Sequence, residues 1–386
     1  MEKVIGFSAG KLVGDTLYFS CNDFCGLYKM DISQQKVIFV SYFPDEDVLQ
    51  KYLHRKVLVF GENLFFIPSG GGKNIHVYNY MTGDIRYVPI FNERGWEGEA
   101  FIEDRYLWMI PYDPRLKCVV KMDLESLEIE EIHNFFGELT DWQYDDKNGR
   151  IFQRLAIAGE SIWFAVLHTN EIVQISLEDC KITRYQIEID DLFGIFIVQN
   201  DMWVASHTKQ FLYKWNPQKG VYERCSVEGC KQDLIPANNI FEVAGNIYAL
   251  PHSSEYITKY NHKTCCFEKV VEYSSSFYFT DPDQIKFSQY DCCQDKIICF
   301  PFNSQDCLLI DTNNNITSIL STVENIDISV EPYLHIGEKL LESKFVSEDK
   351  FIALREFIQL MNIKKDSQKP IILNEAGTKI YRSLAD

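Results

Sequence analysis

This chain is poor in positive charge. Of its 386 residues, 38 are Lys or Arg and 56 are Asp or Glu, which gives a formal net charge of −18 at pH 7. The basic residues form no cluster along the sequence. Binding to nucleic-acid phosphates or to an anionic membrane surface depends on a basic patch. We therefore expect no nucleic acid and no membrane among its partners.

Long apolar runs are also missing. No segment approaches the ~20 consecutive apolar residues that a helix needs to cross a bilayer. The start of the chain, Met1 to Gly6, lacks the charged stretch and long apolar run of a secretory signal. We therefore expect a cytoplasmic protein.

The 12 cysteines have no metal-binding spacing. Cys21 and Cys25 form a CxxxC pair without a second pair, and Cys265-Cys266 and Cys292-Cys293 are directly adjacent. Others, such as Cys299, fall inside apolar runs, where a free thiol packs as a small hydrophobe. Without an export signal we expect reduced thiols and no resident cofactor. A divalent metal is the alternative.

What the sequence does contain is one short pattern repeated seven times. Each copy is an apolar run rich in aromatics, a polar turn, a second apolar run, another turn and a third run. The copies begin at Leu17, Leu64, Leu107, Ile162, Met202, Ile247 and Ile297. Their spacing of about 40–55 residues is typical of the blades of a β-propeller.

A polar pair suited to a two-residue hairpin stands just before each of these runs. Glycine, which tolerates the positive φ of such turns, belongs to or precedes four of the pairs, at Gly14, Gly61, Gly159 and Gly245. We name the run before the hairpin strand A, the run after it strand B, and the next two strands C and D. The pattern predicts an all-β fold over residues 1–330, a seven-bladed β-propeller of four-stranded antiparallel blades. The last blade is expected to close the ring by packing on the first; a β-sandwich is the alternative fold.

Family signatures are sparse. A glycine run follows strand B only at Gly70–Gly72, and the WD and Gly-His dipeptides do not recur. The chain resembles bacterial seven-bladed propellers of the broad kelch- and WD-like group. The stretch from Ser161 to Tyr185 is similar to a repeat of the virginiamycin B lyase family, which are seven-bladed propellers that use His, Glu and a magnesium ion. The resemblance implies the same fold, but the family's catalytic residues do not map onto this chain.

Residues 331–386 depart from the repeat. Pro332 can open a helix, and Ser347-Glu348-Asp349 suits a second helix start. Apolar residues then recur at helical spacing between Phe351 and Met361. We expect a small C-terminal α-helical extension that forms either a lid on the propeller or an arm for docking or dimerisation.

The ends of the B strands suggest a site. His168, His207 and His252 occupy this position in the fourth, fifth and sixth repeats, and Tyr112 lies there in the third. Hairpin geometry places these ends beside the starts of the A strands, on the face that carries the B–C and D–A loops. We expect a cup there, lined also by residues from A-strand starts and D–A loops: Arg55, Glu97, Arg154, Asn239, Trp96 and Trp142. Counting from the turn Gly245-Asn246 predicts that Asn239 lies opposite His252.

Three interpretations of the matched histidines stay open. They can be structural turn residues inherited by each repeat, groups that bind a polar ligand, or metal ligands and acid–base groups. The first function hypothesis is a non-catalytic binding or scaffold propeller that holds a protein or a polar ligand, carbohydrates included. The alternative is a propeller lyase or hydrolase with a His/Glu cup, assisted by a metal.

Overall fold

The computed structural model describes residues 6–22, 24–48, 50–70, 72–90, 96–115, 118–137, 149–230, 235–252, 256–272, 287–301, 306–313 and 316–321. All regular secondary structure in these ranges is β-strand. No helix within them combines the length and the hydropathy of a membrane span. The helical extension expected at 331–386 and Trp142 lie outside the described residues, so both remain predictions.

The strands form antiparallel groups of four whose order in space follows the sequence. Three such sheets come first: β1 (Phe7–Val13), β2 (Thr16–Cys21), β3 (Gly26–Asp31) and β4 (Lys36–Tyr42); β5 (His54–Phe60), β6 (Asn63–Pro68), β7 (Asn74–Asn79) and β8 (Ile85–Pro89); β9 (Gly98–Glu103), β10 (Tyr106–Pro111), β11 (Val119–Asp123) and β12 (Ile129–Ile132). Two further sheets of this kind are β13 (Leu155–Ala158), β14 (Ser161–Ala165), β15 (Glu171–Ser176) and β16 (Ile182–Gln186), and β25 (Phe287–Cys293), β26 (Lys296–Pro301), β27 (Asp306–Asp311) and β28 (Ile316–Ser321).

One larger sheet joins two such groups. Its halves are β17 (Leu192–Val198), β18 (Asp201–Ser206), β19 (Phe211–Asn216) and β20 (Gly220–Val227), and β21 (Asn239–Val243), β22 (Asn246–Leu250), β23 (Tyr256–Asn261) and β24 (Cys266–Glu272). Each half is antiparallel internally, and the outer strands β20 and β24 meet in a short parallel pairing at Ser226–Cys266 and Val227–Phe267. The sheet is thus two four-stranded units linked at their rims.

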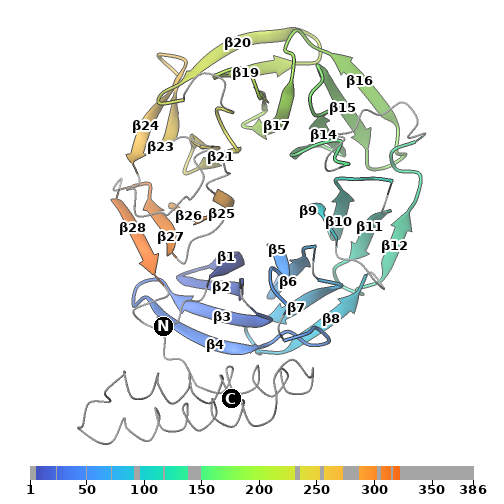
Figure 1. The fold of residues 1–386 in the computed structure, drawn as a ribbon, viewed down its shortest axis with the longest axis vertical. Helices are drawn as coiled ribbons and strands as arrows, with labels where there is room; N and C mark the ends of the chain where they lie inside the picture. The colour runs from blue at the N-terminus through green and yellow to red at the C-terminus, as the bar shows by residue number, and fades with distance from the viewer. Residues whose placement is uncertain are drawn as a thin grey trace, which may run out of the picture.

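The sheets stand in a ring (Figure 1). The first strand of every group, from β1 to β25, lies nearest the centre of the ring, and we call these strands channel-facing. The last strand of every group, from β4 to β28, forms the outer rim. This is the arrangement of a β-propeller. It brings the A strands of all groups together although they are far apart in the sequence.

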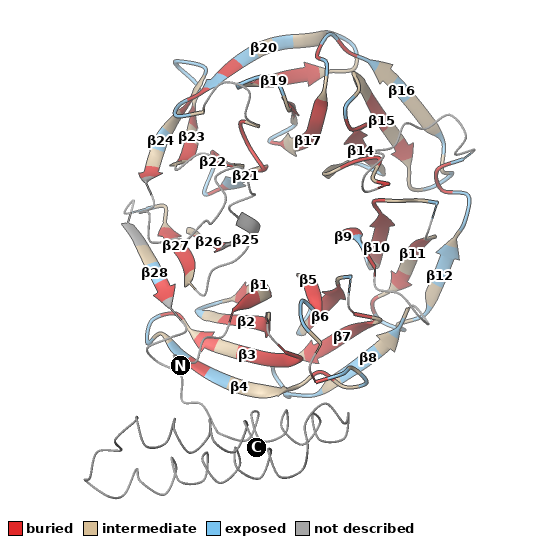
Figure 2. Cartoon of the chain, in the orientation of Figure 1, coloured by how far each residue is buried: buried red, intermediate tan, exposed pale blue. Residues whose placement is uncertain are grey.

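Packing between sheets explains why the repeated runs are continuously apolar. In β6, Leu64, Phe65, Phe66 and Ile67 are all 0% exposed. Leu64 and Phe66 pack with residues of the first sheet, whereas Phe65 and Ile67 pack with residues of β10. A strand buried on both faces shows no polar alternation. The outer strands are the exposed ones (Figure 2).

The cysteines take part in no disulfide in the described part of the chain, and Cys21, Cys25, Cys225, Cys299 and Cys307 are buried. Burial raises the pKa of the Cys25 thiol to about 12. Such thiols are inert core residues at neutral pH.

The hairpin between β21 and β22 corrects one expectation. Val243 pairs with Asn246, so the turn is Ala244-Gly245, with φ of 48° and 75°. Asn239 therefore lies opposite Leu250, and the predicted pairing with His252 is wrong. Moving the centre of a hairpin by one residue moves every cross-strand partner by two.

Among the described residues, the ring closes by packing of the first group on the last, as the repeat order predicts. Lys11 Nζ lies 2.6 Å from Asp291 Oδ1, and the Leu12 amide donates to Asp291 Oδ2 at 2.6 Å. Phe300 of β26 packs in one cluster with Phe7 of β1. β1 keeps its own place beside β2.

Candidate functional site

A cavity of about 660 Å³ lies where the channel-facing strands come together. Its walls are formed by β1, β5, β9, β21 and β25 and by the segment from Arg150 to Arg154. Asn22 and Ser69 on its margin follow the second strands of their groups, and Tyr52 precedes β5. The cavity therefore lies on the face that carries the B–C and D–A loops.

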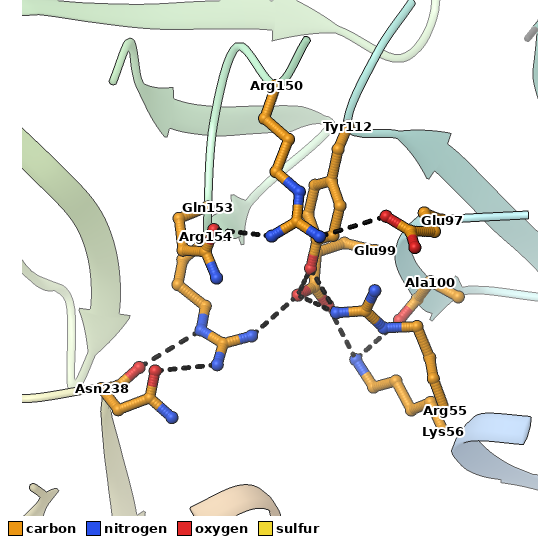
Figure 3. Close-up of polar contacts among 10 residues, drawn as sticks. All are labelled: Arg55, Lys56, Glu97, Glu99, Ala100, Tyr112, Arg150, Gln153, Arg154 and Asn238. Carbon is orange, nitrogen blue, oxygen red and sulfur yellow. Dashed lines mark hydrogen bonds and ion pairs between the residues drawn. The ribbon is translucent and has the colours of Figure 1, made fainter. Parts of the chain in front are cut away.

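The carboxylate of Glu99 lies at the centre of the charged groups in this cavity (Figure 3). Glu99 Oε1 accepts a hydrogen bond from the Tyr112 hydroxyl at 2.8 Å and from Arg154 Nη1 at 3.0 Å. Lys56 Nζ lies 3.7 Å from Oε2, and Arg55 Nη2 lies 4.0 Å from Oε1. One carboxylate is thus shared by three cations.

A bulge in β5 lets two consecutive residues reach this carboxylate. His54 pairs with Pro68 and Lys56 pairs with Ile67, so Arg55 is an extra residue in the ladder. In a regular strand, neighbouring side chains point to opposite faces, and a bulge re-aims one of them. The same irregularity occurs near the start of β1, β17 and β25.

Further contacts hold the cations in place. The Arg154 guanidinium donates to Asn238 Oδ1 at 2.9 Å and to the Asn238 carbonyl oxygen at 3.2 Å. Lys56 Nζ donates to the Ala100 carbonyl oxygen at 2.7 Å. Arg55 donates to the Tyr112 hydroxyl and lies over its ring. The cluster is therefore preorganised by residues from four parts of the chain.

A second pair lies beside the Glu99 cluster. Arg150 Nη2 donates to Glu97 Oε2 at 3.1 Å, and the Arg150 guanidinium lies 4.9 Å from the centre of the Tyr112 ring. Gly98 separates Glu97 from Glu99 and has no room for a side chain. A Cβ there would lie 2.1 Å from the Ile110 carbonyl oxygen and 2.4 Å from Trp96 Cζ2.

The charges shift the ionisation of the cluster. Burial alone would raise the pKa of Glu99, but Lys56, Arg154 and Arg55 together lower that pKa to about 2. Burial raises the pKa of the Tyr112 hydroxyl to about 12. Burial and the neighbouring arginines lower the pKa of Lys56 despite Glu99. At neutral pH Glu99 is ionised and Tyr112 is protonated.

The cavity carries more positive than negative charge near Glu99. The described lining includes Lys11, Arg55, Lys56, Arg150 and Arg154, against Glu97, Glu99, Glu242 and Asp291. Lys11 is paired with Asp291 and Arg150 with Glu97, while Arg55, Lys56 and Arg154 share Glu99. Around Glu99 the cations outnumber the carboxylate by two, and Glu242 reduces the excess over the whole described lining to one positive charge.

The three matched histidines are not part of the described lining of the cavity. The rings of His168 and His207 stack with centroids 4.5 Å apart, and both face Asp191. The ring of Phe193 lies 5.3 Å from that of His207 and 5.7 Å from that of His252. Burial and the nearby Arg154 lower the pKa of His252 to about 4.

Of the other residues predicted to line the cup, most do so and Trp96 does not. Arg55, Glu97, Arg154 and Asn239 line the cavity, and Tyr112 joins them through the Glu99 cluster. Trp96 is 0% exposed and belongs to the core between β6 and β10, so it cannot stack on a ligand in the cup. The expected contribution of Trp96 to the cup was therefore wrong.

Sequence reasoning missed the central residue of the cluster. The polar start of strand A at Glu97-Gly98-Glu99 contains both glutamates, and the predicted lining includes Glu97 but not Glu99. Lys56 and Arg150 were likewise not predicted. Strand alternation places Glu97 and Glu99 on the same face, so it gives no sequence signal that separates the two.

Comparison with known proteins supports the fold but does not indicate a function. No protein-family model matches the sequence, and no curated protein matches it. Among solved structures, a streptogramin B lyase is similar with a TM-score of 0.52 and 12% identity, over 78% of this chain and 91% of that one. A catalytically inactive virginiamycin B lyase from Staphylococcus aureus, solved with quinupristin, is similar with a TM-score of 0.52 and 11% identity, over 78% and 92%.

A computationally designed protein, Ika8, is similar as well, with a TM-score of 0.50 and 6% identity over 84% of this chain and 89% of that one. At these identities a likeness shows the β-propeller fold alone. That fold is shared here by an enzyme and by a designed protein, so the function has to be argued from the site.

Proposed function

We propose that this chain is a seven-bladed, non-catalytic binding propeller whose central cavity holds a small anionic ligand. In this proposal the eight-stranded sheet counts as two blades joined at their rims. The ligand enters from the face that carries the B–C and D–A loops. A polar molecule bearing a carboxylate, such as an acidic sugar, has the chemistry that this cavity favours.

The observation that carries the proposal is the charge imbalance around Glu99. Arg55, Lys56 and Arg154 face a single carboxylate, in a chain whose net charge is −18. Cations brought together in a cavity repel one another, and the lowered pKa of Lys56 reflects burial first and then that repulsion. An anion bound beside them relieves the repulsion and accepts charge-assisted hydrogen bonds.

The size and lining of the cavity support a small molecule. A volume of about 660 Å³ lies within the usual range of small-molecule sites, roughly 300–1,000 Å³. Ser8, Asn22, Gln153 and Asn239 add uncharged polar groups to the lining. Such groups can bind the hydroxyls of a sugar, while the cations bind its carboxylate.

The ionisation of the cluster favours binding over acid–base chemistry. A general acid or base works best with a pKa near the working pH. The pKa of Glu99 is about 2 and that of Tyr112 is about 12, so neither group exchanges protons readily near neutrality. The lyase or hydrolase alternative stays a prediction, and no contact around Glu99 in the described part of the chain favours it.

Isothermal titration calorimetry with the full chain tests the proposal. The probes are D-glucuronate, citrate and inorganic phosphate, with D-glucose as the neutral counterpart of glucuronate. We expect at least one anion to bind, glucuronate to bind about tenfold more tightly than glucose or better, and the affinity to fall with added salt. Lys56→Met should weaken anion binding about tenfold or more, because it removes one of the three cations.

Arg224→Gln is the matched control. Arg224 is an exposed cation on the outer strand β20, far from the channel-facing strands, and its replacement should leave binding unchanged. The proposal is wrong if none of the anions binds the full chain. It is equally wrong if Lys56→Met, shown to be folded by its thermal transition, binds them like the unmodified protein.

A further inference from the structure

We propose that His168, Asp191 and His207 form a second site, separate from the cavity lining, that binds a divalent transition-metal ion of the zinc class. The site lies at the boundary between the sheet of β13–β16 and the one that begins with β17. His168 follows β14, His207 follows β18, and Asp191 directly precedes β17.

The three potential ligand atoms converge on one point. His168 Nδ1 lies 2.8 Å and His207 Nδ1 lies 3.4 Å from Asp191 Oδ1, and all three atoms lie within 4.8 Å of one another. Zinc binds such nitrogen and oxygen atoms at about 2.0–2.2 Å, so neighbouring ligands in a tetrahedral site lie about 3.3 Å apart. The two separations from Asp191 Oδ1, 2.8 and 3.4 Å, lie close to that value.

The backbone frames this arrangement. The His207 amide donates to the Asp191 carbonyl oxygen at 2.8 Å, and the Leu192 amide donates to the Thr169 carbonyl oxygen at 2.9 Å. These bonds tie the two histidine loops to the start of β17. His168 and Asp191 also have left-handed backbone conformations, with φ of 57° and 55°. Such conformations are uncommon in residues other than glycine and cluster at ligand sites.

The donor set selects the class of metal. Two imidazole nitrogens and one carboxylate oxygen suit zinc and its first-row neighbours, whereas magnesium and calcium prefer oxygen ligands alone. The His168 side chain is 54% exposed, so solvent can reach the site. Three protein ligands leave room for water or for a group of a bound molecule as a fourth ligand.

Without a metal, the same residues form a hydrogen-bonded cluster in which Asp191 accepts from His168. The experiment must therefore detect the metal itself. The full chain is freed of metal with a chelator and titrated with Co²⁺, whose weak visible bands report nitrogen and oxygen ligands. Thiolate ligation adds an intense near-ultraviolet band, which separates binding at this site from binding at exposed thiols such as Cys265.

We expect about one Co²⁺ per chain with nitrogen and oxygen ligation, displaced by Zn²⁺ but not by Mg²⁺. His168→Ala and His207→Ala should each weaken Co²⁺ binding about tenfold or more, since each removes one of three protein ligands. His252→Ala is the matched control, because His252 holds the equivalent strand-end position in the next group but is not among the three residues whose ligand atoms converge. Its affinity for Co²⁺ should not change.

His168 is half-exposed, so its replacement should leave the fold intact even if that of the more buried His207 does not. The proposal is overturned if the metal-free chain gains no visible absorption with Co²⁺. It is also overturned if His168→Ala keeps the full signal, or if the spectrum shows thiolate ligation only.

Discussion

His54 Nε2 and His76 Nδ1 lie 2.9 Å apart in the core between the first two sheets, and the surroundings determine which of them donates. His76 Nε2 lies 2.9 Å from the Pro44 carbonyl oxygen, which can only accept. His76 Nε2 must therefore carry the proton, which leaves its Nδ1 as the acceptor for His54 Nε2–H. The His54 side chain is buried beside Phe43, in the wall of the cavity.

This pair makes stability depend on pH. Burial, together with the neighbouring His76, lowers the pKa of His54 well below its usual value, and burial lowers that of His76 to about 4. Because the folded protein resists protonation, the contribution of the pair is fully present above the unfolded pKa of about 6.5. It declines as the pH falls toward about 4, and we expect a loss of about 3 kcal/mol.

Urea unfolding at several pH values between about 7 and 4 measures the slope of the unfolding free energy against pH. The double variant His54→Leu/His76→Leu should lose much of it, whereas His133→Gln, which replaces an exposed histidine, should retain it. An unchanged slope in the double variant would contradict the conclusion that the His54–His76 pair causes the pH dependence.

Glu99→Gln should destabilise the protein by about 3 kcal/mol at neutral pH, since it leaves three cations without their carboxylate. The folded pKa of Glu99 is lowered to about 2. Its contribution is therefore present above the unfolded pKa of about 4.5 and is lost as the pH falls toward 2. Thermal unfolding between neutral and acidic pH should show this loss in the unmodified protein and not in the variant.

Glu97→Gln is the control for that measurement, because its side chain is 58% exposed and its pairing with Arg150 is open to solvent. It should cost less than about 1 kcal/mol. If Glu99→Gln and Glu97→Gln reduced stability equally, the Glu99 cluster would not stabilise the protein more than an exposed ion pair does.

Gly98→Ala should destabilise the protein by roughly 3 kcal/mol, because the new methyl group collides with the Ile110 carbonyl oxygen and the buried Trp96. Gly70→Ala is the comparison. Gly70 also lines the cavity, but its Cβ would meet only the end of the flexible Glu97 side chain, at 3.4 Å. Denaturant unfolding of both variants measures the difference in their stability. A loss of stability for Gly98→Ala as small as that for Gly70→Ala would contradict the close contact of residue 98 with Ile110 and Trp96.

Asp291→Ala should weaken the closure of the ring by about 3 kcal/mol. It removes the partner of Lys11 and of the Leu12 amide, both within 2.6 Å of a largely buried carboxylate. Lys296→Ala disrupts the other ion pair across this junction, with the exposed Asp15, and should cost less than about 1 kcal/mol. Thermal unfolding compares the two, and a larger loss for Lys296→Ala would contradict this account of closure.

The sequence was a good guide to the strands. All seven repeated runs fall in the second strand of a four-stranded group, from Leu17 in β2 to Ile297 in β26. Hairpin turns and continuous apolar runs are local signals, because they reflect backbone preferences and burial on both faces. The turn positions were less accurate, as Asn239 shows, since Ala244 and not Asn246 forms part of the turn.

The candidate site was predicted only in part. The starts of the A strands were correctly expected to be polar, and Arg55, Glu97 and Arg154 do line the cavity. The bulge at Arg55 has no clear mark in the sequence, yet it decides that Arg55 and Lys56 both approach Glu99. Bulges depend on how a strand packs against its neighbours.

By itself the sequence determined the all-β character, the order of the strands and the face that carries the polar residues, because a repeated pattern encodes each unit locally. Only the tertiary structure decided which polar residues meet. Glu99 gathers cations from β5 and from Arg154, and Asp191 brings His168 and His207 together. Those contacts join residues from different sheets, and their geometry follows from closing the ring, which no local pattern specifies.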